Sequence, residues 1–171
     1  MNFIIMRIET KVENMSTIET YLDRRHIFHK LSTETGNHVI ETIAKSAEQE
    51  NIAEAESIIS AIRERESYGT TGIGNEVAIP HGRLRKIDRI YLYVTTLKKP
   101  VDFNSIDGKG VSLFFIILIP EKDNLLYLKL LSRISMICKN KDLLHKLKNA
   151  DSKTDIINFI TDEDRCQLQD R

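Results

Sequence analysis

VSLFFIILIP, residues 111–120, is the longest apolar run of the chain and decides its fold class. The turn sequence DGKG (107–110) precedes the run and Pro120 ends it. A short, nearly continuous apolar run of this kind is typical of a strand that is covered on both faces. A helix needs about 20 apolar residues to cross a bilayer, so this run is far too short for one. We therefore predict an α/β domain in which helices cover both faces of a sheet.

The segments around this run show the periodicities that such a domain needs. A short strand is also predicted over residues 26–31, where apolar and polar residues alternate. Further strands are predicted over residues 77–79 and 90–97, where β-branched and apolar residues gather. Apolar residues at helical spacing predict further elements. These are a short turn at 18–22 and helices over 38–48, 124–139, 142–147 and 152–160. From Thr161 onward the chain is polar, and we expect it to fray.

One more helix is predicted between Asn51 and Gly69. Asn51 serves as its N-cap, and Glu54 stands three residues later as the partner in a capping-box-like pair. Gly69 is placed to end the helix. The following sequence GTTGIG, residues 69–74, holds three glycines in six positions, so no regular structure is expected there.

Composition narrows the function classes. The chain has 171 residues, which suits one domain, and its 25 basic and 25 acidic residues cancel. Without a basic excess, non-specific nucleic-acid binding is not expected. No signal peptide or membrane segment is recognisable, and two cysteines are too few for a disulfide framework, so we expect a cytoplasmic protein. We interpret residues 1–14 as a flexible leader or a start placed too early, 15–165 as the domain and 166–171 as a polar tail.

The candidate functional residues are concentrated in RESYGTTGIGNEVAIPHGRL, residues 65–84. His81 follows an apolar strand and Pro80, so we expect its side chain to be held rigidly at a strand end that leads into a loop. Gly82 leaves space beside the imidazole, and the glycine loop lets backbone N–H groups approach an anion. A neutral imidazole is a competent nucleophile, and Arg65 offers a planar donor pair for phosphoryl oxygens. A solvated charge is the alternative interpretation of Arg65.

Sequence motifs for other kinds of functional site are absent or incomplete. The GIGNEV segment (72–77) resembles a degraded dinucleotide motif, but a strand follows it where a helix is required. No phosphate-binding P-loop and no GxSxG nucleophile motif occur. His26 and His29 lack the additional ligands of a metal site, and Cys138 lies on the apolar stripe of its helix as an inert thiol. We therefore expect neither a metal nor a cofactor.

The run 65–84 resembles the phosphorylation motif of type 2 IIA domains of the bacterial phosphoenolpyruvate-dependent phosphotransferase system. These are the fructose/mannitol and nitrogen-regulatory IIA proteins, and the weaker resemblance extends from about Ile18 to Asp162. It implies a three-layer α/β/α domain around a mixed sheet. It also implies that His81 accepts a phosphoryl group from an HPr-like histidine phosphocarrier. We place phosphate binding at Arg65, Thr71, Gly72, Gly82 and Tyr127.

One position departs from the family pattern. Members usually carry a second active-site histidine in a His-Leu-x-Leu-Leu pattern, where this chain reads YLKLL, residues 127–131. Tyr127 can donate a hydrogen bond to a phosphoryl oxygen, but its phenol does not titrate near neutral pH as an imidazole does. A core tyrosine on the apolar stripe of the helix is an equal alternative.

Three functions follow from this resemblance. Gly82-Arg83-Leu84 resembles the nitrogen-regulatory subgroup, so we favour a stand-alone regulatory IIA protein whose phosphorylation changes which target protein it binds. A sugar-transport IIA that passes its phosphoryl group to a IIB domain is the second hypothesis. A degenerate binding module that takes no phosphate is the third.

Overall fold

The computed structural model describes residues 17–123 and 125–169. Strand β6 (Val111–Pro120) lies centrally in the sheet, and each residue from Val111 to Ile119 is buried. Successive side chains of a strand point to opposite faces, so β6 divides the core into two clusters. Leu113, Phe115, Ile117 and Ile119 belong to one cluster, and Phe114, Ile116 and Leu118 to the other. The predicted doubly covered strand is confirmed.

The sheet is mixed, as the family resemblance implied. Its order is β1 (Ile27–Leu31), β5 (Tyr91–Val101), β6, β3 (Val77–Ala78) and β2 (Gly72–Gly74), with β4 (His81–Leu84) also pairing with β6. β5 and β6 are antiparallel, as are β2 and β3. β1 is parallel to β5, and both β3 and β4 are parallel to β6.

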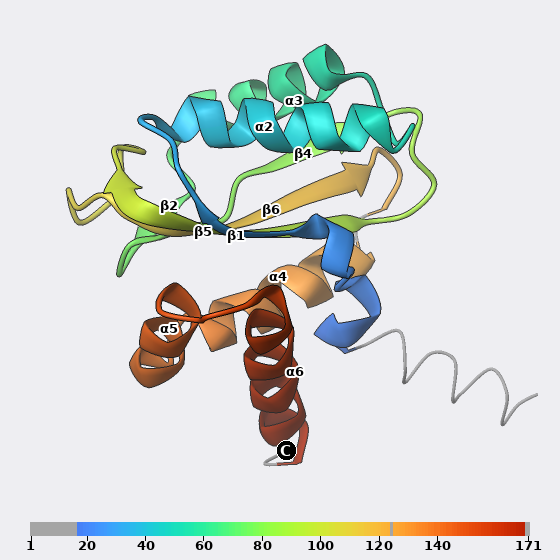
Figure 1. Ribbon diagram of the computed structural model, residues 1–171. Coiled ribbons are helices and arrows are strands. Elements are labelled where there is room, and N and C mark those ends of the chain that lie inside the picture. The colour runs from blue at the N-terminus through green and yellow to red at the C-terminus, as the bar shows by residue number, and fades with distance from the viewer. Residues whose placement is uncertain (1–16, 124, 170–171) are drawn as a thin grey trace, which may run out of the picture.

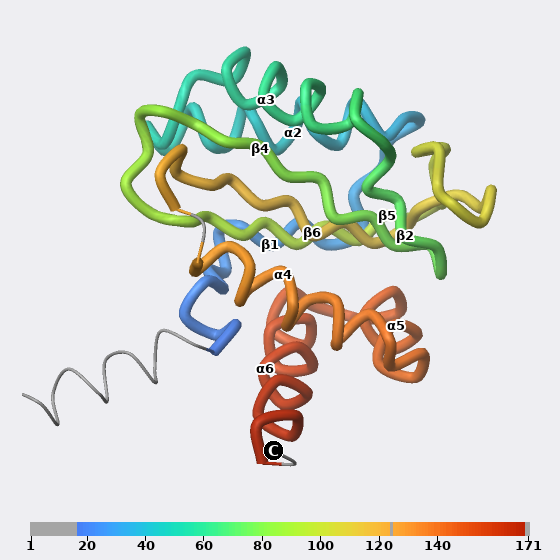
Figure 2. The backbone as a smooth tube through the Cα atoms, turned by 180° about the vertical axis from the view of Figure 1, so that it is seen from behind, coloured from blue at the N-terminus to red at the C-terminus, as the bar shows by residue number. Residues whose placement is uncertain are grey.

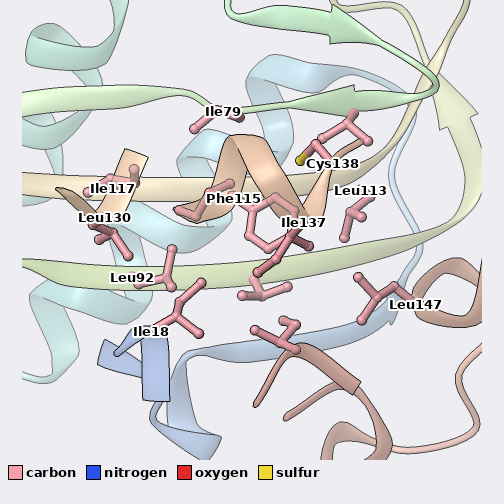
Figure 3. Packing of buried hydrophobic residues seen from close by; sticks show 14 of the residues in the cluster. Ile18, Ile79, Leu92, Leu113, Phe115, Ile117, Leu130, Ile137, Cys138 and Leu147 are labelled. Carbon is pink, nitrogen blue, oxygen red and sulfur yellow. The ribbon is translucent and has the colours of Figure 1, made fainter. Parts of the chain in front are cut away.

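Helices cover both faces, which confirms the three-layer arrangement (Figures 1 and 2). α2 (Gly36–Gln49) and α3 (Ala55–Ser67) lie on one face. On the other face lie α4 (Leu125–Ile137), α5 (Lys141–Lys148), α6 (Lys153–Gln169) and the short 3₁₀ helix η1 (Ile18–Tyr21). A second short 3₁₀ helix, η2 (Arg24–His26), leads into β1. Figure 3 shows the apolar cluster on this second face. In the described part of the chain, no helix combines the length and apolarity of a membrane span.

The start of α3 differs from the expectation. Its N-cap is Glu54, whose side chain makes no capping hydrogen bond, and the Glu48 carboxylate accepts from the Ala55 N–H at 2.9 Å instead. Asn51 has a φ of 57°, and its N–H donates to the Glu48 carbonyl. Asparagine tolerates this left-handed conformation, which ends α2. The predicted Asn51 N-cap is therefore wrong, because the residue ends one helix and does not begin the next.

The predicted fraying from Thr161 onward is also wrong, because α6 continues to Gln169. Asp164 is only 1% exposed and anchors this part of the helix. It accepts hydrogen bonds from the Ile18 backbone N–H at 2.9 Å and from Arg133 at 2.6 Å. The predicted tail at 166–171 is thus helical over 166–169, while the predicted leader at 1–14 lies outside the described residues.

Candidate functional site

The sequence context of His81 suggested a strand end that leads into a loop. The structure instead places His81 at the start of a strand, β4. It pairs with Ile117 of β6, and the Pro80 carbonyl accepts the Ile117 N–H at 2.9 Å. β3 and β4 run along the same edge of β6, separated only by Ile79 and Pro80. Proline has no N–H to donate, which interrupts the ladder at this point. The imidazole is therefore carried by backbone that is held in the sheet.

Two hydrogen bonds fix the tautomer of His81. Nδ1 lies 2.9 Å from the Ile79 carbonyl oxygen, which can only accept, so Nδ1 carries the proton. The Arg65 Nε–H donates to Nε2 at 2.9 Å. A guanidinium has no lone pair to offer, so Nε2 must supply one. His81 is thus held as the neutral Nδ1–H tautomer, and the lone pair lies on Nε2.

The surroundings also favour the neutral imidazole. Burial lowers the pKa of His81 below its ordinary value, and the positive charges of Arg65 and Arg83 add to this effect. The hydrogen bond to Ile79 opposes the shift by favouring the protonated ring. Since the net direction is downward, the Nε2 lone pair stays available around neutral pH.

Gly82 and α3 together bring Arg65 to His81. Arg65 lies in the last turn of α3, where its Nη1 also donates to the Gly69 carbonyl at 3.0 Å. The helix packs closely on β4, because a Cβ at Gly82 would lie 2.9 Å from the Cβ of Ala61. Glycine is therefore needed for the close approach of the helix.

Tyr127 of α4 lies on the other side of the site. Its ring centroid is 5.4 Å from that of His81, and its side chain belongs to the apolar cluster on that face of the sheet. Burial raises the pKa of Tyr127, although Arg65 and Arg83 oppose the shift. The phenol therefore stays protonated around neutral pH. The structure places Tyr127 both in the core and against His81, so the two sequence interpretations are compatible.

These residues line one hollow of about 570 Å³. Its arginines outnumber its carboxylates, which suits an anionic group such as a phosphoryl. The lining residues are Ala61, Glu64, Arg65, Tyr68, His81, Gly82, Arg83, Arg85, Glu121 and Tyr127. A larger hollow of about 750 Å³ lies beside Thr35 and Lys98, but it lacks a bonded histidine–arginine pair.

Two predicted phosphate-binding residues do not line this hollow. Thr71 is buried, and both its hydroxyl and its N–H donate to the Glu66 carboxylate. Gly72 packs against the chain at Ser105, because a Cβ on the glycine would lie 2.8 Å from the Ser105 Cα. Part of the glycine segment forms β2, which pairs with β3, so the expectation of no regular structure over 69–74 is wrong there.

Sequence reasoning did not assign Arg83 and Arg85 to the site. Both lie in or just after β4, and alternate residues of a strand share a face, so Arg83 lies on the same side of β4 as His81. The HGRL sequence (81–84) has no apolar run to reveal a strand. Had β4 been predicted, the spacing of His81 and Arg83 would have identified the second arginine.

The two histidines weighed as metal ligands have separate partners. His26 Nε2 lies 3.2 Å from the Glu50 carboxylate, and His29 Nε2 lies 2.7 Å from the Ala150 carbonyl oxygen. Among the residues that the structure describes, no group of three or more histidine, cysteine or acidic side chains could hold a metal ion. The buried Cys138 has a pKa raised to about 12 by burial, which makes its thiol unreactive.

Comparison with known proteins relates this site to a family. A nitrogen regulatory protein from Bradyrhizobium diazoefficiens is 39% identical over 108 residues, covering 63% of this chain and 70% of that protein. The crystal structure of the nitrogen regulatory protein IIA-Ntr from Neisseria meningitidis superposes with a TM-score of 0.80 at 28% identity, covering 84% of this chain and 99% of that one.

A second solved structure shares the fold. It is a complex of the mannitol enzyme IIA with phosphorylated enzyme IIB from Escherichia coli, with a TM-score of 0.67 at 15% identity, covering 81% of this chain and 96% of that one. The family model described as "Phosphoenolpyruvate-dependent sugar phosphotransferase system, EIIA 2" matches residues 20–163. The chain therefore belongs to the EIIA type 2 family of the phosphoenolpyruvate-dependent sugar phosphotransferase system.

Proposed function

We propose that this chain is a nitrogen-regulatory-type IIA protein that accepts a phosphoryl group on Nε2 of His81 from an HPr-like histidine phosphocarrier. The hydrogen bonds of the imidazole carry this proposal. With Nδ1–H bonded to Ile79 and Nε2 facing Arg65, the nucleophilic lone pair lies beside a guanidinium that suits phosphoryl oxygens. The nitrogen regulatory proteins among its relatives support the regulatory assignment.

The transfer needs only groups that are present on the two proteins. The Nε2 lone pair of His81 attacks the phosphorus of the donor's phosphohistidine, the new N–P bond forms, and the donor's N–P bond breaks with its electron pair returning to the donor imidazole. Nδ1 keeps its proton and its bond to the Ile79 carbonyl, which steadies the positive charge of the phosphorylated ring. Arg65 loses its acceptor at Nε2 and turns to a phosphoryl oxygen.

Phosphorylation would then act as a switch in the cytoplasm. It adds a dianionic phosphoryl group to the imidazole in a surface hollow lined by Arg83 and Arg85, so it changes which proteins can bind there. Transfer to a IIB domain is the second candidate. The mannitol enzyme IIA that shares this fold was solved in complex with phosphorylated enzyme IIB, which makes a IIB domain a partner to test.

The deciding experiment is intact-mass spectrometry at mildly alkaline pH, with phosphoenolpyruvate, enzyme I and a histidine phosphocarrier. Wild-type protein should gain one acid-labile phosphoryl group, and His81→Ala should gain none. Nitrogen-15 NMR of the product should place the phosphorus on Nε2. No gain by wild type beside an active control IIA would contradict the proposal and favour a binding module that takes no phosphate. Efficient onward transfer to a fructose- or mannitol-type IIB would favour the transport role.

A further inference from the structure

Arg83 lies on the same side of β4 as the reacting histidine. Gly82 and Leu84 are buried on the side of α3, where Leu84 joins the apolar cluster beneath α2 and α3. Alternation along the strand places His81 and Arg83 on the opposite side, toward α4. Tyr127 of α4 meets both of them: its ring centroid lies 5.4 Å from the imidazole centroid and 5.6 Å from the Arg83 Cζ.

The same guanidinium also ties β4 to the start of α4. Arg83 Nη1 donates to the Asp123 carbonyl at 2.9 Å and to the Glu121 carbonyl at 3.3 Å. The Asp123 carboxylate in turn accepts the Leu126 N–H at 3.1 Å in the first turn of α4. Arg83 therefore contacts α4 in two ways. Its guanidinium packs on the Tyr127 ring, and it donates to the carbonyls of the turn that precedes the helix. A flexible surface charge would not show two such attachments.

Three groups from three elements surround the His81 imidazole. They are Arg65 from α3, Arg83 from β4 and Tyr127 from α4. The positive charge of Arg83 acts on both His81 and Tyr127: it adds to the lowering of the His81 pKa, and it opposes the burial that raises the Tyr127 pKa. A charge that favours the neutral imidazole also favours a dianionic phosphoryl group in the same hollow. Arg83 can therefore act on the reaction both before and after the transfer.

We propose that Arg83 is a positioning residue of the transfer site, which holds the Tyr127 ring against His81 and places a second positive charge beside the phosphoryl group. This inference rests on the proposed function, because it concerns the same histidine. Arg65 contacts the reacting nitrogen directly, whereas Arg83 acts through Tyr127 and through its charge. The two arginines therefore have different roles, and substitutions can separate them.

Arg89 provides a matched control. Its Cζ lies 4.8 Å from the ring centroid of Tyr91, so it is also an arginine stacked on a tyrosine, and it does not line the His81 hollow. Arg83→Gln and Arg89→Gln change the net charge equally. Arg83→Lys keeps the charge, but a lysine lacks the planar guanidinium that stacks on the ring.

Two measurements test the proposal. The pKa of His81 is followed by NMR in the unphosphorylated proteins, and phosphoryl uptake from a saturating series of phosphocarrier gives kcat and KM. We expect Arg83→Gln to raise the pKa of His81 and to lower kcat about tenfold, the size of one lost charge-assisted contact. Arg83→Lys should retain the wild-type pKa while still losing kcat. Arg89→Gln should match wild type in both measurements.

The outcomes separate this inference from the proposed function. If wild type takes no phosphoryl group, the proposed function fails, and the inference that rests on it fails too. If wild type is phosphorylated but Arg83→Gln matches Arg89→Gln in pKa and kcat, only the inference is overturned. If Arg83→Gln loses its fold by circular dichroism, Arg83→Lys decides: unchanged kcat there overturns the positioning role.

Discussion

The ring of Tyr127 lies beside the imidazole of His81, with centroids 5.4 Å apart and ring planes inclined by 39°. The phenol occupies the position at which the family pattern has a second histidine. Tyr127 is 9% exposed and its pKa is raised by burial, so it has no proton equilibrium near neutral pH. If His81 takes up a phosphoryl group as proposed, it does so without a titrating group at position 127, and Arg65 becomes the first residue to test.

Replacing Arg65 removes the only side-chain donor that the structure places on His81 Nε2 in the described part of the chain. We expect Arg65→Gln to lower the rate of phosphoryl uptake by about 10- to 100-fold, because a charge-assisted hydrogen bond contributes about 1.5–3 kcal/mol. Arg63→Gln is the matched control, since Arg63 lies on the same helix and pairs with Glu41 at 3.5 Å, away from the hollow. Stopped-flow or quenched mass spectrometry measures the rates. Equal rates for the two variants would contradict a phosphate-binding role for Arg65.

The pH dependence of stability follows from the lowered pKa of His81. As the pH falls through the ordinary value of 6.5, the unfolded chain binds a proton on this imidazole before the folded chain does. His81 therefore contributes stability above pH 6.5 that is lost as the pH falls toward the folded pKa. We expect the midpoint of thermal unfolding to decrease more between pH 7.5 and pH 5.5 for wild type than for His81→Gln. A wild-type decrease no larger than that of the variant would show that burial does not shift this group.

The close packing of α3 on β4 predicts a specific effect of Gly82→Ala. The new methyl group would lie 2.9 Å from the Ala61 Cβ and 3.0 Å from backbone atoms of α3, so the helix must shift. We expect a loss of about 1–3 kcal/mol in the free energy of unfolding, together with loss of the Arg65–His81 bond. Gly110→Ala meets Pro100 equally closely, also at 2.9 Å, but away from the site. Both variants should be destabilised in urea, whereas only Gly82→Ala should lose phosphoryl uptake when still folded.

Local sequence patterns predicted most of the helices and strands. The features that they did not predict depend on packing between residues that are distant in sequence. The apolar run of β6 and the helical stripes are properties of neighbouring residues, so they could be read directly. β4 could not be recognised in this way, because its four residues HGRL form a strand only by pairing with β6 and by the fit of Gly82 to α3. Missing β4 meant missing Arg83. Asp164 was likewise hidden, since its burial depends on Arg133 and Ile18, which are distant in sequence.

The structure brings together four of the six predicted site residues. Arg65, His81, Gly82 and Tyr127 line the same hollow, as the family resemblance implied. Thr71 and Gly72 belong to the same motif but face Glu66 and Ser105, respectively. A motif preserves residue types that serve packing together with those that serve chemistry, and only the three-dimensional arrangement separates the two. The assignment of all six residues to the phosphoryl site stays a prediction.

Tyr127 itself can be tested with two substitutions that separate its hydroxyl from its ring. Tyr127→Phe keeps the aromatic contact with His81 and removes the phenolic donor. If the hydroxyl donates to a phosphoryl oxygen, uptake should fall by about fivefold to tenfold, the size of one neutral hydrogen bond. If Tyr127 is only a core residue, uptake should be unchanged.

Tyr127→His restores the residue that the family pattern carries and introduces a group that titrates near neutral pH. An imidazole beside His81 can move a proton during transfer, so we expect passage of the phosphoryl group to a IIB acceptor to become about tenfold faster or more. The measurement is the decay of phosphorylated protein on mixing with the acceptor, with Tyr127→Phe as the ring-preserving control. Equal decay for His, Phe and Tyr at this position would mean that α4 contributes packing to the site and no chemistry.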